Sequence, residues 1–188
     1  PLVRMLTESD EGGVIRLLLA FLEDPQTPQA ALEVIGRRTD VRFVQIWAEH
    51  AGYPPPEVWK ETLGRIRYLA WAEAGHPLWA QLDGPSQAGC IGLLLGCKIE
   101  RSRVFQILEF LLQEGKPEGR RAAVAALEHF PGAKADALVV RTLDDRDPYV
   151  QAEAIRQVRR RNVPDALSRL IRLVETDQAP VREALQEA

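Results

Sequence analysis

The sequence predicts an all-α fold, arranged as an α-solenoid of about six antiparallel helix pairs. Three observations lead to this prediction. Leucine and alanine, which both favour helices, supply 24 and 23 of the 188 residues. Apolar residues recur at the spacing of one helix face, and no strand-like alternation of useful length is present. A sequence pattern also returns at a fixed interval in the second half of the chain, which is typical of stacked helical repeats.

The repeat is clearest in three segments of similar sequence. Residues 119–123 read Gly-Arg-Arg-Ala-Ala, residues 150–154 read Val-Gln-Ala-Glu-Ala, and residues 181–185 read Val-Arg-Glu-Ala-Leu. Successive segments begin 31 residues apart, and Pro117 and Pro148 share that spacing. A period of this length is enough for two short helices. It therefore predicts helix pairs, each of which buries its apolar faces against the next pair.

The helices of the first half are predicted from apolar runs and prolines. The first coincides with the apolar run Val14–Leu22, and the second begins at Pro28. Pro56 opens a Pro-x-Val pattern like that of Pro148, and Pro85 precedes a further copy of the repeat. Proline suits the first helical position because its missing N–H has no partner there in any case. The predicted spans are 12–22, 28–38, 40–51, 56–74, 76–83 and 85–97.

The helices of the second half follow the repeat more closely. One carries apolar residues at i, i+3, i+4 and i+7 from Val104, and another begins its apolar face at Ala137. A polar turn, Asp144–Asp147, ends one helix, and Asp147 is placed to cap the next at Pro148. The predicted spans are 103–114, 117–129, 134–144, 148–161, 164–176 and 180–187.

Small residues are predicted to lie where neighbouring helices meet. Gly92, Ala123 and Ala154 are equivalent in the 31-residue register. Gly89, Gly92 and Gly96 are spaced by three and four residues, so they share one helix face. This spacing within an apolar segment favours close helix packing over a phosphate-binding loop.

The second half of the chain resembles HEAT repeats, in the short form found in bilin-lyase-type proteins and within the wider armadillo-like class. Residues 118–188 carry the resemblance best, through Arg120 and the alanines after it and through the Pro-x-Val patterns at Pro148 and Pro180. The resemblance implies a right-handed α-solenoid and an arginine that pairs with an aspartate in a turn. Arg120 and Arg182 match that arginine position, whereas Gln151 departs from it.

One HEAT-like domain over residues 1–188 is expected, with divergent repeats in 1–84 and regular repeats in 85–188. The chain lacks an initiator methionine, which is consistent with a fragment of a longer protein. A tetratricopeptide pattern competes around Trp59, Leu63 and Tyr68, but its spacings are each one residue too long and it occurs once. HEAT-like repeats are therefore favoured.

Catalytic and metal-binding patterns are missing from the sequence. His50, His76 and His129, together with Cys90 and Cys97, show none of the close pair spacings of zinc sites. The two cysteines, seven residues apart, are predicted to be buried small apolar residues. None of the four serines lies in a Gly-x-Ser-x-Gly pattern. We therefore expect no catalytic residue, no metal, no cofactor and no enzymatic activity.

A basic segment is the first candidate for a binding surface. Residues 152–172 contain six arginines against two acidic residues, in a chain whose net charge is −3. Arg156, Arg159 and Arg160 are the predicted partner-binding residues, and an acidic peptide would suit them. The alternative is structural, because cations at the end of a helix are favoured by the helix dipole.

An aromatic cluster is the second candidate. Seven of the twelve aromatic residues lie between residues 43 and 79. Aromatic side chains are enriched in binding hot spots, but they also fill the core of irregular repeats, which we favour here. The cluster consists of Phe43, Trp47, Tyr53, Trp59, Tyr68, Trp71 and Trp79.

These observations predict a non-enzymatic protein-interaction or scaffold module, which binds a protein or peptide partner on a concave surface of helices. The alternatives are a nucleic-acid-binding HEAT solenoid, as in DNA repair, and a bilin-lyase-like chaperone, which the resemblance implies. Residues 1–115 hold 11 basic and 15 acidic residues, which disfavours nucleic acid. The most apolar runs are too short to span a membrane, and a cytoplasmic location is predicted.

Overall fold

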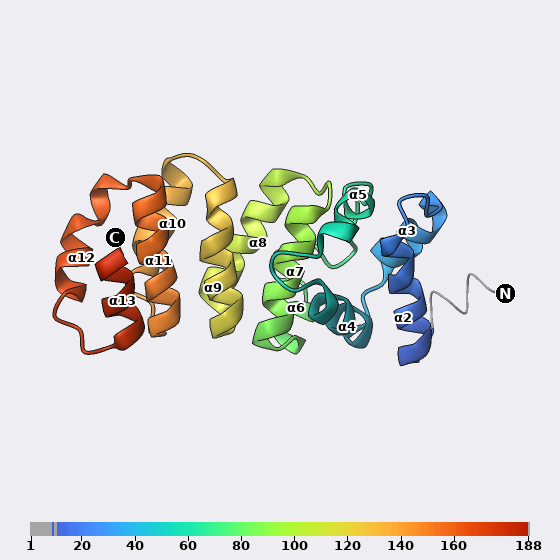
Figure 1. Ribbon diagram of the computed structural model, residues 1–188, viewed down its shortest axis with the longest axis horizontal. Helices are drawn as coiled ribbons and strands as arrows, with labels where there is room; N and C mark the ends of the chain where they lie inside the picture. Colours follow the sequence, from blue (N-terminus) through green and yellow to red (C-terminus); the bar gives the residue numbers. More distant parts are fainter. Residues whose placement is uncertain (1–8, 10, 188) are drawn as a thin grey trace. The chain divides into compact units, whose positions relative to one another are not determined.

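The structure is a computed structural model that describes residue 9 and residues 11–187 (Figure 1). The described residues form helices joined by turns and loops and contain no strand, so the all-α fold class is confirmed. The chain divides into two compact units, one up to Ile107 and the other from Leu108. Each unit is described by itself below, and the single domain over residues 1–188 stays a prediction.

Unit 1 is built from short helices around a buried aromatic core. Its 3₁₀ turns cover Phe21–Glu23 and Glu57–Trp59, and the boundary with unit 2 falls inside α8 (Arg101–Glu114). The other α-helices are α2 (Gly12–Ala20), α3 (Gln29–Arg37), α4 (Val41–Ala51), α5 (Lys60–Leu63), α6 (Leu78–Gln81) and α7 (Gly84–Gly96).

The predicted face of small residues on α7 packs against α4 and α5. A Cβ atom added to Gly89 would lie 2.2 Å from the Ala48 carbonyl oxygen, and one on Gly92 would lie 2.6 Å from the Gly52 carbonyl oxygen. A Cβ atom on Gly96 would lie 2.9 Å from Leu63 Cδ1. At Gly89 and Gly92 the neighbouring backbone is therefore too close for any side chain, and the prediction of close helix packing is confirmed.

The aromatic cluster of the sequence forms the core of unit 1. Trp47, Trp71 and Trp79 are fully buried, and their rings meet edge to face at centroid distances of 6.5 and 5.6 Å. Phe43 and Trp59 are buried as well. The interpretation as core is therefore confirmed for these five residues, whereas Tyr53 is half-buried and Tyr68 is exposed.

The predicted helix over residues 56–74 is wrong beyond Leu63. In a continuous helix the Ile66 carbonyl would accept a hydrogen bond from the Ala70 N–H. Instead, Ile66 accepts from the Lys98 N–H at 2.8 Å, and Ala70 donates to the Gly36 carbonyl at 2.8 Å. The apolar residues of this segment are buried by an extended chain, because tertiary hydrogen bonds replace the helical ones.

Unit 2 consists of the second half of α8 and five further helices. Its 3₁₀ turns cover Leu127–His129 and Pro164–Ala166. The further helices are α9 (Pro117–Ala126), α10 (Ala133–Thr142), α11 (Pro148–Arg161), α12 (Leu167–Leu173) and α13 (Ala179–Glu187). The prolines that the sequence places at helix starts begin α9 and α11, and the Asp147 carboxylate accepts from the Tyr149 and Val150 N–H groups as predicted.

The 31-residue register governs packing in unit 2. The helices α9, α11 and α13 lie side by side, and α10 packs on α11 (Figure 1). Ala123 on α9 and Ala154 on α11 are completely buried. Neighbouring helices therefore pack as expected for a HEAT-like α-solenoid, whereas the superhelical hand and the count of six pairs stay predictions.

Phenylalanine at Ala154 should overpack the interior of unit 2. The expected loss is about 1–3 kcal/mol in the free energy of unfolding, because a larger side chain forces its neighbours out of their rotamers. Thermal and denaturant unfolding would measure it. Ala137→Phe on the exposed face of α10 is the matched control. Unchanged unfolding in both Ala123→Phe and Ala154→Phe would contradict this register.

Arg120 pairs with an aspartate in a turn, as the resemblance to HEAT repeats implies. Its side chain is only 4% exposed, and its guanidinium donates to both carboxylate oxygens of Asp145 at 2.8 and 2.9 Å. The hydrogen bonds to Asp145 raise the pKa of Arg120. A third hydrogen bond reaches the Gly115 carbonyl at 2.8 Å. Arg120 therefore ties α9 to the turn after α10.

Candidate functional site

The three predicted binding arginines lie together at the end of α11. Arg156, Arg159 and Arg160 stand at i, i+3 and i+4, so they share one helix face. A cavity of about 350 Å³ is lined by these three side chains and by Ala184 and Glu187 of α13. We call this cavity the arginine groove. The sequence placed the arginines on one face, and the packing of α13 beside α11 supplied the second wall.

Two of these arginines already contact carboxylates. Arg156 Nε lies 3.2 Å from Glu187, with Glu153 at 3.5 Å from its Nη1. Arg160 lies 3.2 Å from Glu128. The described residues offer Arg159 no ion pair and no hydrogen bond to its side chain. The carboxylates of Glu187 and Glu128 are exposed, and pairs of this kind contribute little, so a competing carboxylate can displace them. Glu153 is nearly buried and stays beside Arg156.

The rest of the basic segment has a structural role. Arg161 donates to the Leu127 and Phe130 carbonyls and to the Asp136 carboxylate, all within 3.0 Å. Arg169 pairs with Asp144 at 2.8 Å. Arg161 and Arg169 therefore hold the preceding repeat, which is a structural role different from the helix-dipole effect that the sequence suggested.

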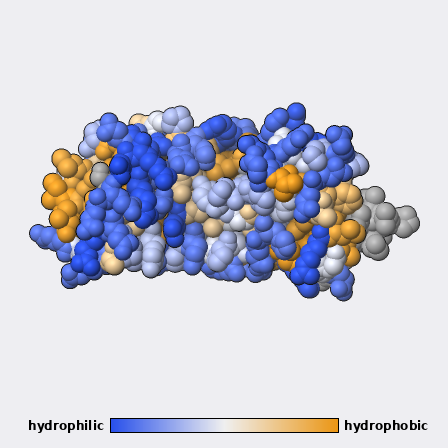
Figure 2. Space-filling model, viewed as in Figure 1, coloured by the Kyte–Doolittle hydropathy of each residue, from blue (hydrophilic) through white to orange (hydrophobic). Residues whose placement is uncertain are grey.

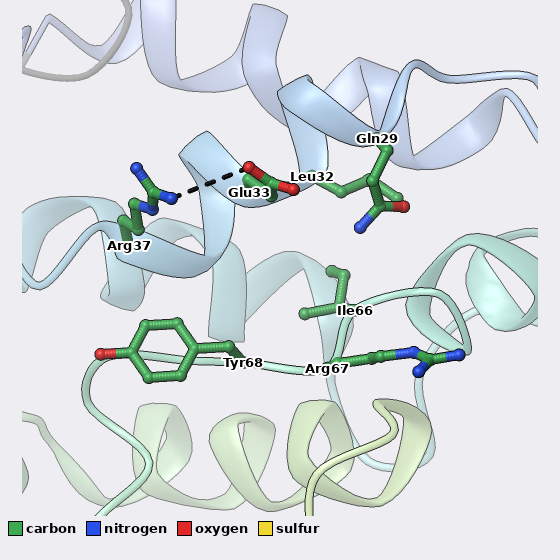
Figure 3. A pocket seen from close by; sticks show the side chains of 7 residues that line it. All are labelled: Gln29, Leu32, Glu33, Arg37, Ile66, Arg67 and Tyr68. Carbon is green, nitrogen blue, oxygen red and sulfur yellow. Dashed lines mark ion pairs between the residues drawn. The ribbon is translucent and has the colours of Figure 1, made fainter.

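A second groove lies in unit 1. It has a volume of about 380 Å³ and separates α3 from the extended segment after α5 (Figure 3). We call it the α3 groove. One of its lining residues, Tyr68, belongs to the aromatic cluster that was the second candidate binding surface in the sequence. The lining residues are Gln29, Leu32, Glu33, Arg37, Ile66, Arg67 and Tyr68.

An exposed apolar row is the third surface feature. Leu167, Ile171 and Val174 are more than 60% exposed and stand at i, i+4 and i+7 on and after α12. They account for the apolar surface over α12 at the left edge of Figure 2. None of the residues of α12 is buried.

The candidate ligands for a metal are scattered. Among the residues that the structure describes, no three His, Cys, Asp or Glu side chains gather in a way that could hold a metal ion. Cys90 and Cys97 are buried as predicted, and burial raises the pKa of both thiols. His50 Nδ1 lies 2.8 Å from the Ile46 carbonyl, and His76 Nδ1 accepts from the Leu78 N–H. Burial and local contacts account for all four of these residues.

Over the described part of the chain, no helix is long and apolar enough to cross a membrane.

The comparison with protein families agrees with the repeat register. The family model of HEAT repeats matches residues 106–188, so the resemblance is confirmed there. No curated protein and no solved structure matches the chain. HEAT repeats generally mediate protein–protein interactions or scaffolding, and the family is typically non-enzymatic. The arginine groove lies within the matched segment.

Proposed function

We propose that this chain, whose residues 106–188 are HEAT repeats, is a non-enzymatic interaction module that binds an acidic segment of a partner protein in the arginine groove. One observation carries the proposal. Three arginines from one face of α11 line a single cavity, and Arg159 has no ion pair within the described residues. A scaffold role at a cytoplasmic location stays a prediction.

The ion pairs of the groove indicate the chemistry of its ligand. The Arg156 guanidinium already holds the carboxylate of Glu187, whose side chain is 58% exposed. An incoming carboxylate could replace Glu187 on Arg156 and gain Arg159 at the same time. Arginine presents a planar fork of donors that matches a carboxylate, so glutamate or aspartate side chains fit this groove.

Arg159→Glu should weaken binding of a labelled oligo-glutamate peptide to the full chain by about tenfold or more. The change removes the unpaired cation and places a like charge beside the ligand, and tenfold corresponds to about 1.4 kcal/mol. Fluorescence anisotropy at low and at physiological salt would measure the dissociation constants. Binding should weaken as salt rises, because the charges are exposed.

Two further variants sharpen this experiment. Arg141→Glu changes the same charge on the exposed face of α10, outside the groove, and should match the wild type. Glu187→Gln should strengthen binding up to about fivefold, because it removes the exposed one of the two carboxylates that pair with Arg156. Equal effects of Arg159→Glu and Arg141→Glu would refute the groove as the site. Equal binding of duplex DNA, with the same sensitivity to Arg159→Glu, would favour the nucleic-acid alternative.

A further inference from the structure

The apolar row of α12 stands at positions that are buried one repeat earlier. A step of 31 residues relates Ile171 and Val174 to Val140 and Leu143, which lie in α10 and directly after it. Val140 and Leu143 are buried in unit 2, whereas Ile171 and Val174 are 61% and 66% exposed. The row therefore repeats the side chains of a packing surface, but nothing among the described residues covers it.

The exposed side chains of the row are large, apolar and adjoining. Leu167, Ile171 and Val174 share one helix face, and they form the apolar surface over α12 in Figure 2. Leu170 beside them is only half-buried, so the apolar surface extends past the row. A continuous apolar surface of this kind marks a place where another protein surface packs.

One edge of the row carries two charges of opposite sign. Arg172 directly follows Ile171. Glu175 directly follows Val174, so the two charged residues lie on the same side of the row. Both are exposed, and within the part of the chain that the structure describes neither takes part in an ion pair. The Arg172 guanidinium reaches the Ser168 carbonyl at 3.4 Å. An acidic partner would suit Arg172 but be repelled by Glu175, and a basic partner the reverse.

A second copy of the same face satisfies both charges. Two α12 helices related by a two-fold axis run antiparallel, which reverses the order of the charges on one of them. Ile171 of each copy then lies near Val174 of the other, and each Arg172 comes within reach of the opposite Glu175. The face is thus complementary to itself in its apolar row and in its charges, as an interface between identical patches requires.

We propose that the chain forms a two-fold symmetric dimer through the apolar row of α12. The two rows pack antiparallel, and two ion pairs between Arg172 and Glu175 flank them. Each copy contributes about two turns of helix, so the interface is small and the dimer dissociates on dilution. None of these residues lines the arginine groove, so peptide binding there and dimerisation are separate properties.

Sedimentation velocity of the full chain between about 10 µM and about 1 mM tests the proposal. The sedimentation coefficient should rise with concentration from that of one chain toward that of two. Ile171→Glu should weaken this association by about tenfold or more, because each dimer would bury two carboxylates in the apolar contact. Val58→Glu is the matched control, since Val58 is a similarly exposed apolar residue of unit 1, and this variant should associate like the wild type.

Charge reversal identifies the second copy as the occupant. Arg172→Glu and Glu175→Arg should each weaken the dimer by about threefold or more, because like charges then face each other across the axis. An equimolar mixture of these two variants should associate at least as well as the wild type, since opposite charges meet again in the mixed dimer. The double variant Arg172→Glu/Glu175→Arg should recover the affinity for the same reason.

Three results would overturn the proposal. One is a chain that stays monomeric up to about 1 mM, which would leave a different protein surface as the occupant of the row. The others are association that Ile171→Glu leaves unchanged and a mixture of the two charge variants that does not recover. Binding of the oligo-glutamate peptide is measured separately, so all three results leave the proposed function of the arginine groove standing.

Discussion

Arg120→Met is expected to lower the free energy of unfolding by about 3–5 kcal/mol. The Arg120 and Asp145 side chains are 4% and 10% exposed, so the variant leaves a carboxylate nearly buried without its cation. The Gly115 carbonyl loses its hydrogen bond from Arg120 as well. Methionine keeps much of the length of arginine. The loss of unfolding free energy therefore reflects the missing charge more than the missing side-chain volume. Urea unfolding followed by circular dichroism would measure it.

The control for this prediction is another arginine–aspartate pair of the same unit. Arg169 and Asp144 are also 25 residues apart, but their side chains are 35% and 55% exposed. Arg169→Met should therefore cost no more than about 1 kcal/mol. The double variant Arg120→Met/Asp145→Asn should recover part of the loss, since it also removes the unpaired charge. Similar losses for Arg120→Met and Arg169→Met would show that the buried pair contributes no more to the free energy of unfolding than the exposed pair.

Gly89→Ala is expected to destabilise the protein by about 3 kcal/mol, although alanine is the better helix former. The added Cβ atom would lie 2.2 Å from the Ala48 carbonyl oxygen, 2.7 Å from the carbonyl carbon and 3.0 Å from Cα. All three atoms belong to the backbone of α4, so no side-chain rotation can relieve the clash. The helices α4 and α7 must move apart, which opens the core beside Trp47. Thermal unfolding monitored by tryptophan fluorescence would detect the change.

Gly13→Ala is the matched control for this second prediction. Gly13 also lies in a helix, but no atom is within 4 Å of the position of its Cβ. The substitution should therefore leave stability unchanged or raise it by up to about 1 kcal/mol. Equal stability of the two alanine variants would be incompatible with the close contact between α4 and α7.

Only some of the residues that line the two grooves could be predicted from the sequence. The arginines at 156, 159 and 160 could be placed on one face because helix periodicity acts within a single element. Ala184 and Glu187 could not be added, because they join the groove only when α13 packs beside α11. Of the residues that line the α3 groove, only Tyr68 was a candidate in the sequence, as a member of the aromatic cluster. This groove is formed by the non-helical segment after α5, where the apolar spacing predicted a helix over 56–74. The spacing of apolar residues cannot distinguish a helix from a non-helical segment when either structure would bury Ile66 and Leu69.

By itself, the sequence determined the helical class, most helix starts and the repeat of unit 2. Prolines, aspartate caps and apolar spacing act over a few residues, so their effects are visible without a structure. The tertiary structure alone decided which arginines are structural and which are available. Arg161 and Arg159 are two residues apart in one basic run. The Arg161 guanidinium is hydrogen-bonded to the preceding repeat, whereas Arg159 lines a cavity. That difference arises from contacts with residues 25 to 34 positions away, which only folding brings together.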